Sequence, residues 1–176
     1  AAPREPGYLN YVDVNGDGYI SDTDRVIIGD PNPGFTYGFN SSFQLGNFTL
    51  SLAFLGVTSA QILNVNLSQE WDPSYALPAN FRREAYYGAW TPDSPSDRFM
   101  ALKANSNPER YMCLDRYIED ASFLRLSSVT VNYSFSMPRK SFISNIVIGA
   151  SVNNAFIWTD YTGWDPKVSS YGSDMM

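Results

Sequence analysis

The amino-acid sequence predicts an all-β fold built from antiparallel strands. Three observations support this prediction. Apolar side chains recur at every second position, Phe, Trp and Tyr make up 15% of the chain, and long stretches carry no charged residue. A period of two is typical of strands, because successive side chains of a strand point to opposite faces, and aromatic residues are enriched in strands.

Four stretches show the alternation, at 35–45, 48–57, 128–135 and 146–158. Their apolar positions are Phe35, Tyr37, Phe39, Phe43 and Leu45; Phe48, Leu50, Leu52 and Phe54; Val129, Val131, Tyr133 and Phe135; and Ile146, Ile148, Ala150, Val152, Phe156 and Trp158. Ser41 and Asn154 interrupt the first and the last series. The lengths of these stretches are close to the roughly 9–11 residues that a tilted membrane strand needs.

Charged residues are absent from long parts of the chain. Residues 31–69, 126–138 and 141–159 contain no Asp, Glu, Lys or Arg. Alternation alone is also compatible with a soluble β-sandwich. Such a sandwich keeps charged residues on the solvent-exposed face of its strands. A strand between lipid and a polar lumen does not need them. The charge-free stretches therefore favour a large transmembrane β-barrel with long extracellular loops.

The first two stretches form a predicted hairpin at 35–57, and the last two form another at 122–159. Gly46-Asn47 suits a two-residue type II′ turn, which would pair Leu45 with Phe48. Short turns of outer-membrane barrels face the periplasm. Aromatic residues near the strand ends would then mark the two membrane interfaces: Phe43, Phe48, Tyr133 and Phe135 the inner one, and Phe35, Tyr37, Phe156 and Trp158 the outer one.

Residues 58–121 are predicted to be a long, folded extracellular loop, because disordered segments are poor in aromatic residues. A short helix is expected from an N-cap at Asn80 through Tyr87, ended by Gly88. Exposed aromatic side chains could contact substrate or a partner, or could pack the loop's own core. The candidates are Trp71, Tyr86, Tyr87 and Trp90, together with Trp164 in the segment 160–176.

Residues 1–34 form a further predicted extracellular loop, which carries a calcium-type motif. Its oxygen ligands would be Asp13, Asn15, Asp17, the backbone carbonyl of Tyr19, Ser21 and Asp24. Calcium is a hard cation that takes six to eight oxygen ligands, and Gly18 supplies the sharp turn between them. Pro and Gly flank the loop, so no EF-hand helices are expected. The alternative is a metal-free Asn-Gly and Asp-Gly turn.

Composition excludes several functions. The net charge of −6 argues against a nucleic-acid partner. The single Cys113 forms no intrachain disulfide, and the absence of His rules out a Ser-His-Asp triad or a His-ligated zinc site. No secretory signal peptide and no apolar run long enough for a membrane helix is present. Glu119-Asp120 is a weak candidate for hydrolase carboxylates, because adjacent strand residues point to opposite faces.

An ordered series of motifs resembles the C-terminal barrel of the SusC/RagA family of TonB-linked outer-membrane proteins. The series comprises Tyr11–Ile20, Ile28–Pro31, Pro33–Phe39, Ala89–Pro95, Tyr117–Leu126, Asn154–Phe156 and Tyr161–Pro166. In this family Gly often stands at the position of Ala121. The resemblance covers nearly the whole chain, although each motif alone is weakly specific.

The resemblance implies a transporter of the bacterial outer membrane and no catalytic residues. It implies a SusD-like surface lipoprotein as partner, import of glycans or peptides, and contact with TonB through a plug that this chain lacks. It also leads us to expect a final strand after about residue 176. The competing hypothesis is a secreted, calcium-stabilised β-domain that binds carbohydrate.

Overall fold

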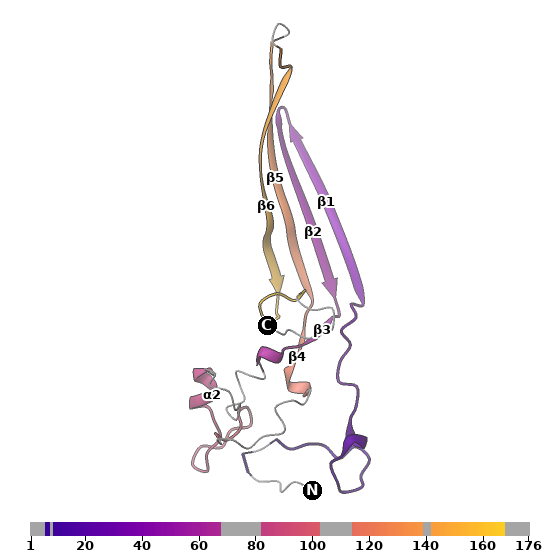
Figure 1. The fold of residues 1–176 in the computed structure, drawn as a ribbon, viewed down its shortest axis with the longest axis vertical. Coiled ribbons are helices and arrows are strands. Elements are labelled where there is room, and N and C mark those ends of the chain that lie inside the picture. Colours follow the sequence, from indigo (N-terminus) through magenta and orange to yellow (C-terminus); the bar gives the residue numbers. More distant parts are fainter. Residues whose placement is uncertain (1–5, 8, 68–81, 103–113, 139–141, 168–176) are drawn as a thin grey trace. The chain divides into compact units, whose positions relative to one another are not determined.

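The computed structural model describes residues 6–7, 9–67, 82–102, 114–138 and 142–167 (Figure 1). They belong to two compact units. Within the described ranges, the sheet unit comprises residues 30–62 and 120–168, and the loop unit comprises residues 1–29 and 63–119.

Four long strands make up the sheet unit. They are β1 (Phe35–Leu45), β2 (Phe48–Thr58), β5 (Phe123–Ser136) and β6 (Asn145–Thr159). They pair as one antiparallel sheet in the order β1-β2-β5-β6 (Figure 1). The four alternating stretches therefore form antiparallel strands, as predicted. The sheet is open, with β1 and β6 at its edges.

The turn between β1 and β2 confirms the predicted register. Leu45 pairs with Phe48, and Phe43 pairs with Leu50. Gly46 has a φ of +58°, whereas Asn47 is not among the residues with positive φ. Positive φ at the first central residue alone distinguishes a type II′ turn from type I′.

Pairing between the strands lines up the apolar side chains in rows. Directly paired residues of adjacent strands point to the same side of a sheet. The rows are Leu45–Phe48–Tyr133–Ile148, Phe43–Leu50–Val131–Ala150, Ser41–Leu52–Val129–Val152, Phe39–Phe54–Leu126–Phe156 and Tyr37–Gly56–Leu124–Trp158. These rows define the apolar face of the sheet, and the residues between them define the polar face.

The apolar face stays continuous because β5 carries an extra residue at Ser127. Pairing with β2 passes from Ser128 to Leu126, so Ser127 has no partner there. Such a bulge shifts the alternation by one position, which puts Leu126 on the same face as Val129. Strand β6 is irregular at Asn154, which has a φ of +51°. Asn154, which interrupts the apolar series of the sequence, lies in this irregularity.

Two short strands within the predicted loop 58–121 were not predicted. Strands β3 (Gln61–Leu63) and β4 (Ile118–Asp120) form a two-stranded sheet. Next to them, the backbone N–H of Ala121 donates to the carbonyl of Ala60 at 2.8 Å. A small core of the sheet unit forms there from Ala60, Ile62, Ala121 and Tyr161, with Val57 packed against it.

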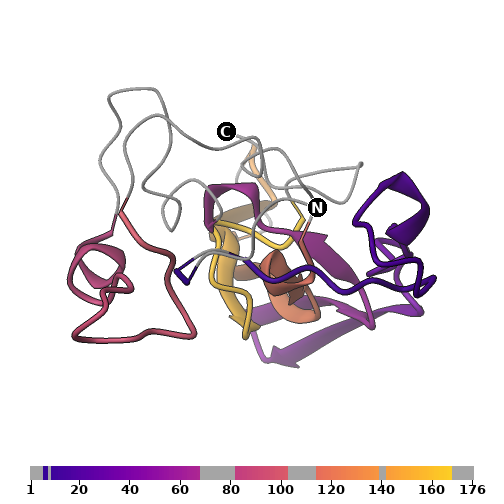
Figure 2. The same ribbon diagram turned by 90° about the horizontal axis from the view of Figure 1, so that it is seen from below.

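Short helical turns of the loop unit include η1 (Asp22–Asp24), α2 (Arg83–Tyr87) and η3 (Asp115–Tyr117). Figure 2 shows η1 within the indigo loop. The predicted helix exists but begins at Arg83, and the side chain of its N-cap residue, Arg82, makes no capping hydrogen bond. Asn80, its predicted cap, lies outside the described residues. Across the described ranges, no helix has the length and apolarity to cross a membrane.

Candidate functional site

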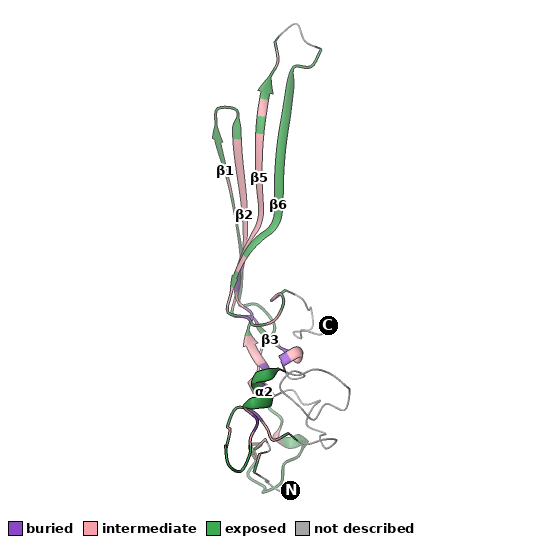
Figure 3. Ribbon diagram, turned by 90° about the vertical axis from the view of Figure 1, so that its left-hand side faces the viewer, coloured by how far each residue is buried: buried purple, intermediate pink, exposed green. Residues whose placement is uncertain are grey.

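The apolar face of the sheet is exposed rather than sealed in a protein interior. Phe39 is 60% exposed and Ile148 is 62% exposed. Figure 3 shows β1 and β6 as largely exposed and β2 and β5 as intermediate. A broad exposed apolar surface of this kind marks contact with another apolar phase, which is either protein or lipid.

Aromatic side chains gather at both ends of the apolar face. At one end the rings of Phe35 and Tyr37 stack at 5.9 Å. At the same end of the sheet the rings of Phe156 and Trp158 lie 4.7 Å apart. At the other end, Tyr133 and Phe135 lie 4.6 Å apart. The sequence predicts two groups of aromatic residues near the strand ends, and the strand register puts them at the two ends of one face.

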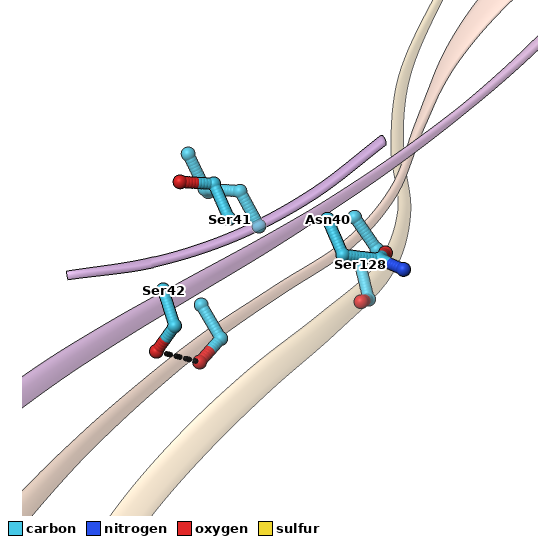
Figure 4. Close-up of a pocket in the computed structure, with 7 residues that line it drawn as sticks. Asn40, Ser41, Ser42 and Ser128 are labelled. Carbon is cyan, nitrogen blue, oxygen red and sulfur yellow. Dashed lines mark hydrogen bonds between the residues drawn. The ribbon is translucent and has the colours of Figure 1, made fainter. Parts of the chain in front are cut away.

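The polar face consists mainly of uncharged side chains along most of its length. Its rows are Gln44–Thr49–Asn132–Gly149, Ser42–Ser51–Thr130–Ser151 and Asn40–Ala53–Ser128–Asn153. The hydroxyl oxygens of Ser42 and Ser51 lie 3.2 Å apart (Figure 4). Asn40, Ser42, Ser51, Ala53 and Ser128 line an open hollow there, together with Ser41 and Leu52. Such a surface offers hydrogen-bond donors and acceptors without selecting for charge.

One charged side chain stands on the polar face. Arg125 is paired with Leu55 and Ile157 in its row, among apolar neighbours. Its Nη2 donates to Asp165 Oδ1 at 2.5 Å, and its side chain is only 12% exposed. The guanidinium also lies 5.2 Å from the ring centroid of Phe123. No local pattern in the sequence indicates this ion pair, because its partners are 40 residues apart.

The calcium-type loop is held by its own acidic side chains. Asp13 accepts from the backbone N–H of Gly16 at 2.6 Å and of Gly18 at 2.7 Å. Asp17 accepts from the N–H of Tyr19 at 2.8 Å. The amide of Asn15 donates to Asp17 Oδ2 and to Thr23, and Ser21 caps η1.

Asp24 closes this loop. Its Oδ1 accepts from the N–H of Val14 at 2.9 Å, and its Oδ2 accepts from the N–H of Ser21 at 2.8 Å. These backbone bonds, that of Ser21 above all, hold the pKa of Asp24 below its ordinary value. In the described part of the chain, no three Asp, Glu, His or Cys side chains cluster so that they could hold a metal ion. A carboxylate has about four lone-pair sites, so each acid keeps acceptor capacity beyond these bonds.

The predicted aromatic contacts are spread over the chain. Tyr86 and Tyr87 are 55% and 78% exposed, and their rings meet edge to face at 5.2 Å. Trp90 is partly buried, and its ring packs on Gly7, where an added Cβ would come within 2.7 Å. Trp164 is 80% exposed and belongs to the sheet unit, whereas the other three belong to the loop unit. Trp71 lies outside the described residues.

The carboxylates considered for hydrolysis make structural hydrogen bonds. Glu119 accepts from the side-chain amide of the buried Asn64 at 3.2 Å. Asp120 accepts from the backbone N–H of Ser122 at 2.8 Å. Both groups organise the ends of short strands.

The chain is similar in sequence to known proteins over nearly its whole length. The chain is 30% identical over 177 residues to TonB-dependent receptor P3 of Formosa agariphila, covering 97% of this chain and 16% of that protein. It is 31% identical over 163 residues to TonB-dependent receptor SusC of Bacteroides thetaiotaomicron, covering 91% of this chain and 15% of that protein. The chain is homologous to SusC/RagA-type TonB-dependent receptors. No family model matches it.

Solved structures show the same fold. Two structures of the RagAB peptide importer match with TM-scores of 0.69 and 0.71, at 21% and 20% identity. The matches cover 80% and 84% of this chain but 15% and 16% of the solved chains. The chain thus corresponds to about a sixth of a SusC/RagA-type receptor. Receptors of this type reside in the bacterial outer membrane and are transporters rather than enzymes, which agrees with the predicted location and the predicted class of protein.

Proposed function

We propose that the chain is part of a TonB-dependent transporter and that its four-stranded sheet is a section of the transmembrane barrel wall. The observation that carries this proposal is the set of five apolar rows across β1, β2, β5 and β6. In a barrel wall the apolar face contacts lipid, and the polar face lines the lumen. The exposure of the apolar face and its two aromatic bands support this orientation.

The edges of the sheet support the same proposal. Unpaired backbone N–H and C=O groups in a bilayer cost several kcal/mol each, so membrane strands occur in closed barrels. Strands β1 and β6 each have one unpaired side in this sheet. We expect further strands of the whole receptor to pair with them.

Partners and cargo are proposed from homology. Homology to SusC and RagAB supports a SusD-like surface lipoprotein as partner, TonB contact through a plug elsewhere in the receptor, and import of a glycan or a peptide. Among these relatives, the RagAB importer is named for peptides. The uncharged polar face is compatible with either kind of cargo.

The barrel proposal is tested with a matched pair of neighbouring residues on β5. Val129 lies on the apolar face and Thr130 on the polar face. In the full-length receptor, Val129→Arg should make the free energy of folding into vesicles less favourable by about 2–4 kcal/mol, as for arginine facing the middle of a bilayer. Thr130→Arg should fold nearly as well as the unchanged receptor. Equal effects of the two substitutions would contradict the assignment of faces.

Detergent dependence separates the barrel from a secreted β-domain. A barrel with a lipid-facing apolar surface should aggregate in plain buffer and be monodisperse in detergent. A full-length protein that stays monodisperse without detergent would favour the secreted carbohydrate-binding domain instead.

We also propose that the loop from Asp13 to Asp24 binds a structural calcium ion. Support comes from the ligand spacing and from the hydrogen bonds that already hold its acidic side chains in one small loop. Hydrogen exchange of the full-length receptor should be slower in this loop with calcium than with chelator. The double variant Asp13→Ala, Asp17→Ala should remove that difference and leave β1 and β2 unchanged. An equal exchange rate with and without chelator would rule out the ion.

A further inference from the structure

The segment after β6, residues 160–167, folds onto the polar face of the sheet. Its Asp165 contacts Arg125, and the strand register places Arg125 on that face. Its Tyr161 is 6% exposed and belongs to the small core with Ala60, against which Val57 packs. Val57 also belongs to a polar-face row, Thr36–Val57–Phe123–Thr159. Two anchors at different points of the segment therefore lie on the same side.

Hydrogen bonds fix the start of the segment. Thr159 Oγ1 donates to the carbonyl of Ser122 at 2.8 Å and accepts from the N–H of Tyr161 at 3.2 Å. The hydroxyl of Ser122 in turn accepts from the N–H of Ser59 at 3.0 Å. The ends of β2, β5 and β6 are thus tied to the segment where it leaves the sheet.

Tyr161 and Pro166 of the segment are buried, which fixes its backbone on both sides of Trp164. The ring of Tyr161 occupies the space over Gly163, where an added Cβ would come within 2.3 Å of the Tyr161 hydroxyl. Asp165 also accepts from the N–H of Lys167 at 2.9 Å, which closes the turn. Trp164, between these anchors, is 80% exposed. An exposed aromatic side chain on a fixed backbone loses little conformational entropy when it makes a contact.

We propose that residues 160–167 form a fixed constriction at one mouth of the lumen, clamped by the Arg125–Asp165 ion pair, and that Trp164 contacts solutes entering there. This inference rests on the proposed function, because the polar face faces a lumen only if the sheet is part of a barrel wall. A lipid contact for Trp164 is less consistent with the structure, since both anchors hold the segment on the side opposite the apolar face.

The clamp is tested first, by hydrogen exchange in the full-length receptor. Asp165→Asn removes the charge that Arg125 faces, so residues 160–167 should exchange about tenfold faster. The control is Asp22→Asn, which disrupts the Arg25–Asp22 pair at 2.9 Å, whose side chains are 75% and 87% exposed. This control should leave exchange in 160–167 unchanged. If hydrogen exchange of residues 160–167 is unchanged in Asp165→Asn, the ion pair does not hold the segment and the proposed clamp is wrong.

The constriction is tested by thiol labelling of the receptor in membranes, with its native cysteines replaced. Trp164→Cys should react with a small charged maleimide much faster than with a long polyethylene glycol maleimide. Adding Asp165→Asn should speed the reaction with the long reagent. Equal rates with both reagents in the clamped receptor would place residue 164 on an open outer surface and would overturn the constriction.

Val152→Cys separates this inference from the proposed function. Val152 lies in the central row of the apolar face, paired with Val129, so a barrel wall predicts slow labelling by both water-soluble reagents. Fast labelling at 152 would refute the lipid-facing assignment itself. Slow labelling at 152 with equal rates at 164 would refute only the constriction.

Discussion

The ring of Tyr37 lies directly over Gly56, its partner on the neighbouring strand. A Cβ at position 56 would come within 2.0 Å of Tyr37 Cζ, and Gly56 is buried beneath the ring. An aromatic residue that covers a cross-strand glycine is a known way to stabilise a sheet at a position without a side chain. The pair closes one end of the apolar face, next to the row that contains Phe39.

Gly56→Ala should therefore destabilise the sheet through overpacking, by about 1–3 kcal/mol. Gly38→Ala is the control, because a Cβ there would meet only the carbonyl of Phe54, at 3.7 Å. Urea unfolding of the full-length receptor in vesicles measures both. In a receptor that also carries Tyr37→Ser, Gly56→Ala should lower the free energy of unfolding by less. If Gly56→Ala lowers it equally with and without the Tyr37 ring, contact with the ring is not the cause of the destabilisation.

The hairpin turn gives a second prediction. Gly46→Val places a β-branched residue at a φ of +58°, which should cost about 1–2 kcal/mol in the same unfolding assay. The double substitution Gly46→Asn, Asn47→Gly reverses the order of the two turn residues and favours a type I′ turn of equal length. That double variant should keep the pairing of Leu45 with Phe48 and stay near the stability of the unchanged receptor. A larger loss for the double variant than for Gly46→Val would contradict the turn assignment.

The sequence was sufficient to predict the long strands and the first turn, because alternation and turn chemistry are local signals. The change of alternation at Ser127 has a signal in the sequence that was not used: apolar residues occupy even positions at Leu124 and Leu126 but an odd position at Val129. Strands β3 and β4 have three residues each, too few for a period of two to be recognised. The Arg125–Asp165 pair depends on how the chain returns after β6, which no local pattern encodes.

The calcium-type loop should lose order in acid. The backbone hydrogen bonds that Asp24 accepts, that from Ser21 above all, hold its pKa below the ordinary value of an aspartate. The stabilisation from its backbone bonds is therefore fully present above about pH 4 and is lost as the pH falls through the lower value of the folded loop. Hydrogen exchange of the amides of Val14 and Ser21, corrected for intrinsic rates and measured in chelator, checks this.

Asp24→Asn provides the control for that experiment. Its amide nitrogen cannot accept a hydrogen bond, so one of the two oxygen positions that hold the loop is lost. We expect faster exchange at neutral pH and a weaker dependence on acid. If the variant keeps the acid transition of the unchanged loop, a group other than Asp24 is responsible.

The bulge at Ser127 gives the sharpest test of the register. Deleting Ser127 restores strict alternation along β5, so residues 123–126 would exchange faces relative to residues 128–136. Arg125 would then point to the apolar face, and Leu124 and Leu126 to the polar face. In a barrel wall this puts an unpaired charge toward lipid, and we expect the deleted receptor not to fold into membranes.

Ser127→Ala separates the role of the extra residue from that of its side chain. The Ser127 hydroxyl is buried, and no hydrogen-bond partner is found for it in the described structure. Because an unpaired buried hydroxyl costs free energy, Ser127→Ala should be neutral or stabilising by about 1 kcal/mol. Membrane insertion measured by protease protection compares the two variants. Normal insertion of the deletion variant would mean that β5 tolerates either register, and the continuous apolar face across β2, β5 and β6 would no longer hold.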